Sequence, residues 1–134
     1  MANRIERTSL ERHDADCGAP MALVVDDEPE VLSAMVDLFQ ILGYRVRFAG
    51  CGGKALELLR QAPDVEVLCT DVLMPRMDGV TLARKARACK PDIKVLLVSG
   101  SPDTVAELHG GEPGEFDLLM KPVLLSEVAI ALRR

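Results

Sequence analysis

The chain has 134 residues, of which 49% are hydrophobic and 28% are charged, and its formal net charge is −5 at pH 7. This length favours one domain, and the apolar content is sufficient for an ordinary core. The acidic balance and the lack of a long basic run argue against a nucleic-acid-binding surface. No apolar run approaches the roughly 18 residues that a membrane-spanning helix needs.

Residues 1–20 are polar and mixed in charge, and they lack the apolar centre of a secretory signal. Ile5 and Leu10 are too few to anchor a stable helix. We therefore expect a disordered extension here, with a linker helix from a larger protein as the alternative. The folded domain is expected to cover residues 21–134.

From residue 21 onward, short apolar runs alternate with stretches whose apolar residues recur every three or four positions. The runs predict β-strands and the stretches predict amphipathic helices. The expected strands cover residues 21–25, 44–49, 65–70, 93–98 and 116–120. The expected helices cover residues 29–42, 54–62 and 78–88, a short stretch between 101 and 111, and about 125 to 134. Pro29 suits a first helical position, Gly43 a C-terminal cap and Asp78 an N-terminal cap.

Five strands that alternate with helices predict an α/β fold of the type (βα)5. The strands are almost continuously apolar, which is typical of a parallel sheet that helices cover on both faces. Right-handed crossovers make a doubly wound arrangement the economical solution. The second strand is followed by no reactive side chain, so we place it at an edge, which gives the strand order 2-1-3-4-5.

Polar side chains follow the other four strands. Asp26 and Asp27 follow the first strand, Asp71 the third, Ser99 the fourth and Lys121 the fifth. Ligands of open α/β sheets bind outside the carboxyl ends of the strands, at a topological switch point. We therefore expect these five side chains to converge.

Three carboxylates at one end of a sheet need a positive partner, since two of them about 4 Å apart repel by roughly 4 kcal/mol at an effective dielectric of 20. Mg²⁺ (or Mn²⁺) prefers oxygen ligands and keeps waters that a phosphate can replace. Lys121 supplies a second positive charge, and Ser99 can donate a hydrogen bond to a phosphoryl oxygen. Metal, cation, donor and oxygen nucleophile are the parts of a phosphoryl-transfer site.

Four strings of the sequence resemble the motifs of response regulator receiver domains. They are residues 24–29 (VVDDEP), 71–79 (DVLMPRMDG), 97–100 (LVSG) and 121–122 (KP). The resemblance covers residues 21–134 in the right order and spacing, and four motifs in register are highly specific. It implies a flavodoxin-like fold and a signalling phosphoacceptor of a two-component phosphorelay rather than an enzyme.

The resemblance also implies a role for each matching residue. Asp71 matches the phosphoacceptor of the family, and Asp26 and Asp27 match its acidic pair, with Asp27 the more direct metal ligand. The implied metal ligands are Asp26, Asp27, Asp71 and the backbone carbonyl of Leu73. Ser99 and Lys121 match the hydroxyl and the ammonium group that contact the phosphate. The phosphoryl donor would be a phosphohistidine on a sensor histidine kinase or a histidine phosphotransfer protein.

Two positions depart from the family pattern. Leu118 stands three residues before Lys121, where receivers usually have an aromatic ring that couples the hydroxyl residue to the surface. Phe116, two residues further back, is expected to be too distant to replace that ring. Leu73 has no polar group to orient a hydrolytic water, which predicts a long phosphoryl lifetime. The glycine-rich segment 110–114 is expected to be mobile.

The leading hypothesis is a phosphorylation switch of the face formed by the helix between 101 and 111, strand 116–120 and the last helix. That face is also where we expect a homodimer, if one forms. A receiver-like binding module that no longer uses phosphate and a metal-dependent phosphohydrolase are the alternatives. The chain is a stand-alone receiver or part of a hybrid sensor kinase. Four cysteines without a CxxC pair favour a reducing, cytoplasmic location.

Overall fold

The computed structural model describes residues 18–100 and 116–134, which include five strands and four helices. The strands are β1 (Met21–Val25), β2 (Arg45–Ala49), β3 (Val65–Asp71), β4 (Lys94–Ser99) and β5 (Asp117–Met120). The helices are α3 (Pro29–Ile41), α4 (Gly52–Gln61), α5 (Gly79–Cys89) and α7 (Leu125–Arg133). Residues 1–17 of the expected extension, the helix expected between 101 and 111, and the segment 110–114 lie outside the described residues.

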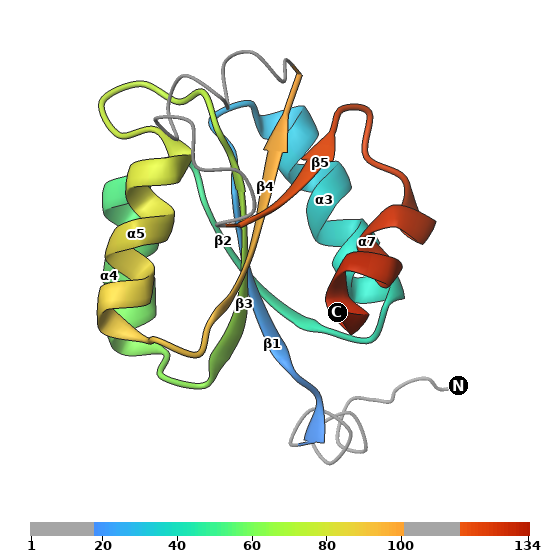
Figure 1. The fold of residues 1–134 in the computed structure, drawn as a ribbon, viewed down its shortest axis with the longest axis horizontal. Helices are drawn as coiled ribbons and strands as arrows, with labels where there is room; N and C mark the ends of the chain where they lie inside the picture. Colours follow the sequence, from blue (N-terminus) through green and yellow to red (C-terminus); the bar gives the residue numbers. More distant parts are fainter. Residues whose placement is uncertain (1–17, 101–115) are drawn as a thin grey trace.

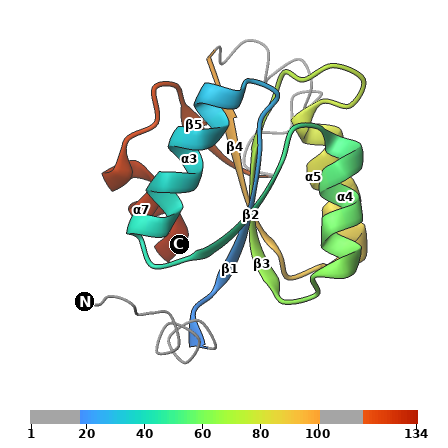
Figure 2. The same ribbon diagram turned by 180° about the vertical axis from the view of Figure 1, so that it is seen from behind.

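The five strands form one parallel sheet in the order β2-β1-β3-β4-β5. Helices α4 and α5 cover one face of the sheet, and α3 and α7 cover the other (Figure 1), as the view from behind also shows (Figure 2). The predicted doubly wound α/β fold and strand order are therefore confirmed. All five carboxyl ends lie at the same end of this parallel sheet, which is where ligands of such folds bind.

Local signals set most of the helix boundaries. Pro29 begins α3, and the chain leaves this helix through Gly43, whose φ of +94° lies in a region that side chains rarely adopt. Asp78 caps α5, because its Oδ1 accepts a hydrogen bond from the Thr81 N–H at 2.8 Å. Helix α4 begins at Gly52, two residues earlier than predicted, since the extended backbone of Cys51 already forms its N-terminal cap. None of these four helices is long and apolar enough to cross a membrane.

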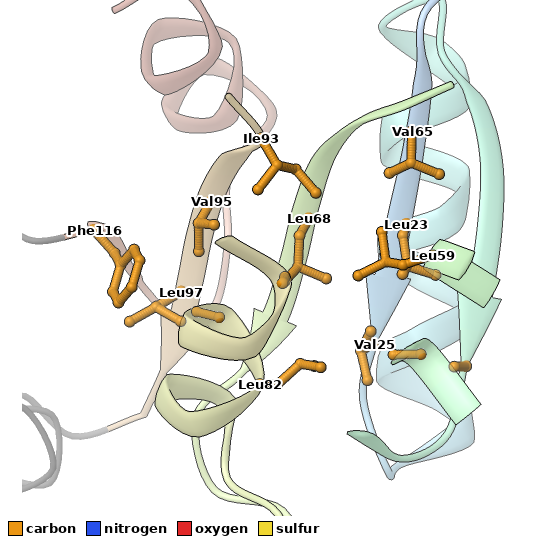
Figure 3. Packing of buried hydrophobic residues seen from close by; sticks show 14 of the residues in the cluster. Leu23, Val25, Leu59, Val65, Leu68, Leu82, Ile93, Val95, Leu97 and Phe116 are labelled. Atoms are coloured by element: carbon orange, nitrogen blue, oxygen red, sulfur yellow. The ribbon is translucent and has the colours of Figure 1, made fainter. Parts of the chain in front are cut away.

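The core consists of two apolar clusters, one on each face of the sheet. Neighbouring strand residues alternate between them: Leu23 and Val25 face α4 and α5, whereas Ala22 and Val24 face α3 and α7. Figure 3 shows the first cluster, in which aliphatic side chains from four strands meet those of α4 and α5. Each large aliphatic side chain that is fully buried contributes about 1.5–3 kcal/mol. The sheet is thus rigidly held from both sides, which fixes the positions of the strand ends.

Two glycines allow a matched test of the chain reversal after α3. Gly43→Ala should lower the free energy of unfolding by about 1–2 kcal/mol, because alanine disfavours a positive φ. Gly53 lies in α4, where a new methyl group meets no atom within 4 Å. Gly53→Ala should raise the free energy of unfolding by about 0.4–1 kcal/mol, because alanine lowers the conformational entropy of the unfolded chain. Urea denaturation followed by circular dichroism measures both. Equal losses in the two variants would contradict the left-handed requirement at Gly43.

Candidate functional site

The carboxyl ends of β1, β3, β4 and β5 surround one small hollow. Its volume is about 270 Å³, and the residues that line it are Asp27, Glu28, Asp71, Leu73, Ser99, Gly100 and Lys121. These residues lie at or just after the ends of four different strands, and Asp26 directly follows β1. The predicted convergence of polar side chains at this end of the sheet is therefore what the structure shows.

Three carboxylates form a tight acidic cluster in this hollow. One oxygen each of Asp26, Asp27 and Asp71 lies within 4.8 Å of the other two. Asp26 is 3% exposed and Asp71 is 8% exposed, whereas Asp27 is open to solvent. The Glu28 N–H donates a hydrogen bond to Asp26 Oδ1 at 2.9 Å, which fixes that carboxylate. Hard divalent cations take carboxylate oxygens as ligands, so the cluster fits an ion such as Mg²⁺.

Lys121 is the positive partner that the acidic cluster requires. Its Nζ lies 3.3 Å from Asp71 Oδ1 and 3.5 Å from Asp26 Oδ2. Burial lowers the pKa of Lys121, but Asp71 and Asp26 outweigh burial, so this pKa lies above the ordinary lysine value. Burial raises the pKa of Asp71, Asp26 raises it further, and Lys121 offsets only part of that rise. The pair is therefore a strongly held ammonium beside a carboxylate whose ionised form is costly.

Ser99 and Lys121 are placed side by side by the backbone. The Lys121 N–H donates to the Ser99 carbonyl at 2.9 Å, directly after the β4–β5 pairing of Ser99 with Met120. Ser99 is 2% exposed and ends β4, and the peptide bond between Lys121 and Pro122 is cis. Ser99 and Lys121 therefore line the hollow from adjacent strands.

The loop between β3 and α5 forms the wall on the side of Asp71. It turns tightly at Arg76, which has a φ of +69°, and the Met77 N–H donates to the Pro75 carbonyl at 2.7 Å across this turn. The Gly79 N–H closes the loop by donating to the Val72 carbonyl at 2.8 Å. The Leu73 side chain is 58% exposed and lies at the mouth of the hollow.

Leu118 and Phe116, the ring that was considered as its replacement, differ in how far they are exposed. Leu118 is on β5 and is 37% exposed. Phe116 is 7% exposed and belongs to the core cluster on the face of α4 and α5, where Figure 3 labels it. The Arg87 guanidinium carbon lies 5.1 Å from its ring centre. The ring of Phe116 is thus built into the core and does not line the hollow beside Ser99.

A model of the response regulator receiver domain matches residues 22–133, which is most of the chain. The chain belongs to the response regulator receiver domain family. This assignment agrees with the fold, the strand order and the acidic cluster that the described residues form.

Individual relatives differ in how much of their length this receiver domain represents. The chain is 35% identical over 117 residues to the sensor kinase CckA of Brucella abortus. This match covers 87% of the chain but only 12% of CckA. The chain is 34% identical over 112 residues to the response regulator MprA of Mycobacterium leprae. This match covers 83% of the chain and 48% of MprA. The chain therefore spans about half or less of these curated relatives.

Solved structures of similar proteins agree with this fold. A crystal structure of a response regulator receiver domain protein from Clostridium thermocellum superimposes with a TM-score of 0.76 at 27% identity. The match covers 85% of this chain and 91% of that one. The receiver fold therefore accounts for most of the chain.

The raised pKa of Asp71 predicts a gain in stability when its charge is removed. The folded receiver holds the Asp71 proton more tightly than the unfolded chain does. The stability linked to this proton is present below the unfolded pKa and is lost as the pH rises through the folded pKa. Asp71→Asn should therefore melt at a higher temperature than the wild type at neutral pH in EDTA.

Thermal melts from about pH 4 to pH 8 measure this difference, which should shrink at the acid end. Asp37→Asn, which removes an exposed carboxylate of α3, is the matched control and should give no such gain. If the wild type is as stable as Asp71→Asn at pH 8, the ionised Asp71 carboxylate does not destabilise the fold, and the prediction is wrong.

Proposed function

We propose that this receiver domain accepts a phosphoryl group on Asp71 as part of a two-component phosphorelay. The observation that carries the proposal is the surroundings of Asp71: a nearly buried carboxylate at a strand end, 3.3 Å from Lys121 Nζ, opening into a small hollow. A nucleophile needs one accessible oxygen, a nearby cation and room for the incoming group. Asp71 has all three.

The proposed reaction moves one phosphoryl group between two side chains. An oxygen of Asp71 forms a bond to phosphorus while the phosphorus–nitrogen bond of a donor phosphohistidine breaks. Lys121 holds positive charge beside the new acyl phosphate, and the Ser99 hydroxyl donates a hydrogen bond to one of its oxygens. The chain thus assists its own phosphorylation and dephosphorylation but turns over no separate substrate.

A divalent ion completes the proposed site. Asp26, Asp27, Asp71 and the backbone carbonyl of Leu73 would hold Mg²⁺ or Mn²⁺, which would offset the charge of the carboxylates and of the arriving phosphoryl group. The clustering of three carboxylate oxygens within 4.8 Å supports this assignment. Lys121 alone provides one positive charge against three negative ones.

The proposed consequence is a change in the surface around β5 and α7. Phosphorylation adds roughly −1.5 to −2 charges at neutral pH, and Ser99 and Lys121 would follow that charge. Leu118 has no ring to swing inward, and Phe116 is built into the core, so the shift would pass through the β4 and β5 ends without the usual aromatic residue. This surface would then change its affinity for a partner or for a second copy.

The proposed partners follow from the reaction. The donor would be a sensor histidine kinase or a histidine phosphotransfer protein, and the receiver would work either alone or as part of a hybrid kinase. No nucleic acid or membrane contact is assigned to this domain. Cys51, Cys69 and Cys89 are all free thiols, which supports a reducing, cytoplasmic setting.

One observation favours a second candidate function, a binding module that works without phosphate. At the position where receivers usually have the aromatic ring that couples the site to the surface, this chain has Leu118, a partly exposed aliphatic residue. Phosphoryl labelling separates the two functions. A metal-dependent phosphohydrolase is disfavoured, because Leu73 stands where such enzymes commonly have an acid.

The direct test is incubation with a small acyl phosphate and Mg²⁺, read by intact-protein mass spectrometry. The wild type should gain one phosphoryl group, and Asp71→Asn should gain none. Asp92→Asn, which removes an exposed carboxylate far from the hollow, is the matched control and should label like the wild type. Undiminished labelling of Asp71→Asn, or an unlabelled wild type, would refute the proposal.

Leu73 is expected to prolong the lifetime of the phosphoryl group. Its aliphatic side chain lies at the mouth of the hollow and can neither orient nor activate a water molecule. Leu73→Gln should shorten the lifetime by up to about 10²-fold, the low end of what a positioned polar group contributes. Leu73→Met, which keeps an apolar group of similar size, is the control. Loss of label from the wild type within seconds, measured after removal of the donor, would contradict the prediction.

A further inference from the structure

Thr70 is a polar side chain in an otherwise apolar part of the sheet. It is 0% exposed, and it directly precedes Asp71 in β3. Its neighbours at alternate positions, Leu68 and Val72, belong to the core cluster under α4 and α5, where Figure 3 labels Leu68. Because successive side chains of a strand point to opposite faces, Thr70 points away from the acidic cluster, toward α5.

The Thr70 hydroxyl is directed at the backbone of Asp71. Thr70 Oγ1 lies 2.9 Å from the Asp71 carbonyl oxygen and donates a buried hydrogen bond to it. A valine would fill the same volume without this bond, so packing alone does not require threonine here. The bond fixes the peptide unit between Asp71 and Val72 from the far face of the sheet.

Gly79 holds the same peptide unit from the start of α5. A methyl group on Gly79 would lie 2.1 Å from the Asp71 carbonyl oxygen and 3.0 Å from the Val72 Cα, closer than real side chains come to backbone. The Gly79 N–H donates to the Val72 carbonyl at 2.8 Å, and the Val72 N–H donates to the Val98 carbonyl at 3.0 Å. Glycine at position 79 therefore allows the first residue of α5 to contact the backbone of Asp71 and Val72 directly.

This peptide unit links the two groups that the site depends on. On one side is the Cα of Asp71, whose carboxylate lies 3.3 Å from Lys121 Nζ. On the other side, the chain continues through Val72 to Leu73 at the mouth of the hollow. A rotation of the peptide unit would therefore move the carboxylate and redirect the loop together. Displacements of about 1 Å at a reacting group cost much of its reactivity.

We propose that Thr70 and Gly79 are positioning residues, which set the carboxylate of Asp71 and the entry of the Leu73 loop from the opposite face of the sheet. Neither residue is among those that line the hollow. The inference rests on the proposed function of Asp71, since it explains how that carboxylate is aimed. A threonine that only fills the core is the competing explanation, and it predicts that valine serves equally well.

The test compares Thr70→Val with Thr70→Ser in the full chain. Mg²⁺ affinity is measured by calorimetry, and the labelling rate at saturating Mg²⁺ is measured with a small acyl phosphate. Thr70→Val should weaken the affinity and slow the labelling by about three- to tenfold each, the range set by one buried hydrogen bond. Thr70→Ser keeps the hydroxyl and should stay within about twofold of the wild type in both measurements.

Two further variants separate positioning from general destabilisation. Val128→Ala removes a buried contact of α7 on the other face of the sheet, so it should lower the melting temperature but leave Mg²⁺ affinity and labelling unchanged. Gly79→Ala forces the peptide unit to shift and should weaken Mg²⁺ binding at least as much as Thr70→Val does. Agreement with these expectations supports the positioning role.

Three results would overturn it. These are wild-type behaviour of Thr70→Val, equal losses in Thr70→Val and Thr70→Ser, and a loss of Mg²⁺ affinity in Val128→Ala that matches its loss of stability. A wild type that takes up no label would instead defeat the proposed function of Asp71. The Mg²⁺ titrations still decide the positioning role in that case, because unchanged affinity in Thr70→Val overturns it.

Discussion

The ammonium group of Lys121 holds two nearly buried carboxylates together, and most of the site is arranged around that contact. Asp26 and Asp71 lie 3.5 and 3.3 Å from Lys121 Nζ, at the ends of neighbouring strands. Burial raises the pKa of Asp71, and Asp26 adds to that rise, so one lysine does not fully compensate the cluster. An acidic cluster with too little positive charge has a built-in affinity for a divalent ion. Because positive charge is scarce in the cluster, the added negative charge of a phosphoryl group would act strongly on the neighbouring side chains.

The rest of the fold serves to keep these groups in place. Two apolar clusters hold the sheet from both faces, so the strand ends cannot drift apart. The backbone hydrogen bond from the Lys121 N–H to the Ser99 carbonyl keeps these two residues side by side at the hollow. On the opposite face, Thr70 donates a hydrogen bond to the peptide unit after Asp71, and Gly79 packs closely against the same unit. The charged groups are thus held by the backbone around them, whereas Leu118 on β5 offers no ring beside them.

The sequence predicted the fold and the convergence of polar residues at one end of the sheet, because both depend on simple local patterns. Apolar runs marked the strands, and the placement of Asp26, Asp71 and Lys121 after three of them predicted a common end of the sheet. The early start of α4 was missed, since Gly52 and Gly53 are poor helix formers whose helical state depends on packing. Thr70 was missed as well. The available signal was a polar residue inside a buried strand, but its hydrogen bond to Asp71 depends on geometry that no periodicity reveals.

We expect the acyl phosphate to form on Asp71 and on no other carboxylate of the cluster. Borohydride reduction of the labelled protein converts a phosphorylated aspartate to homoserine, and peptide sequencing by mass spectrometry then locates it. Homoserine is expected at position 71 alone. Homoserine in place of Asp26 or Asp27, with Asp71 intact, would contradict it.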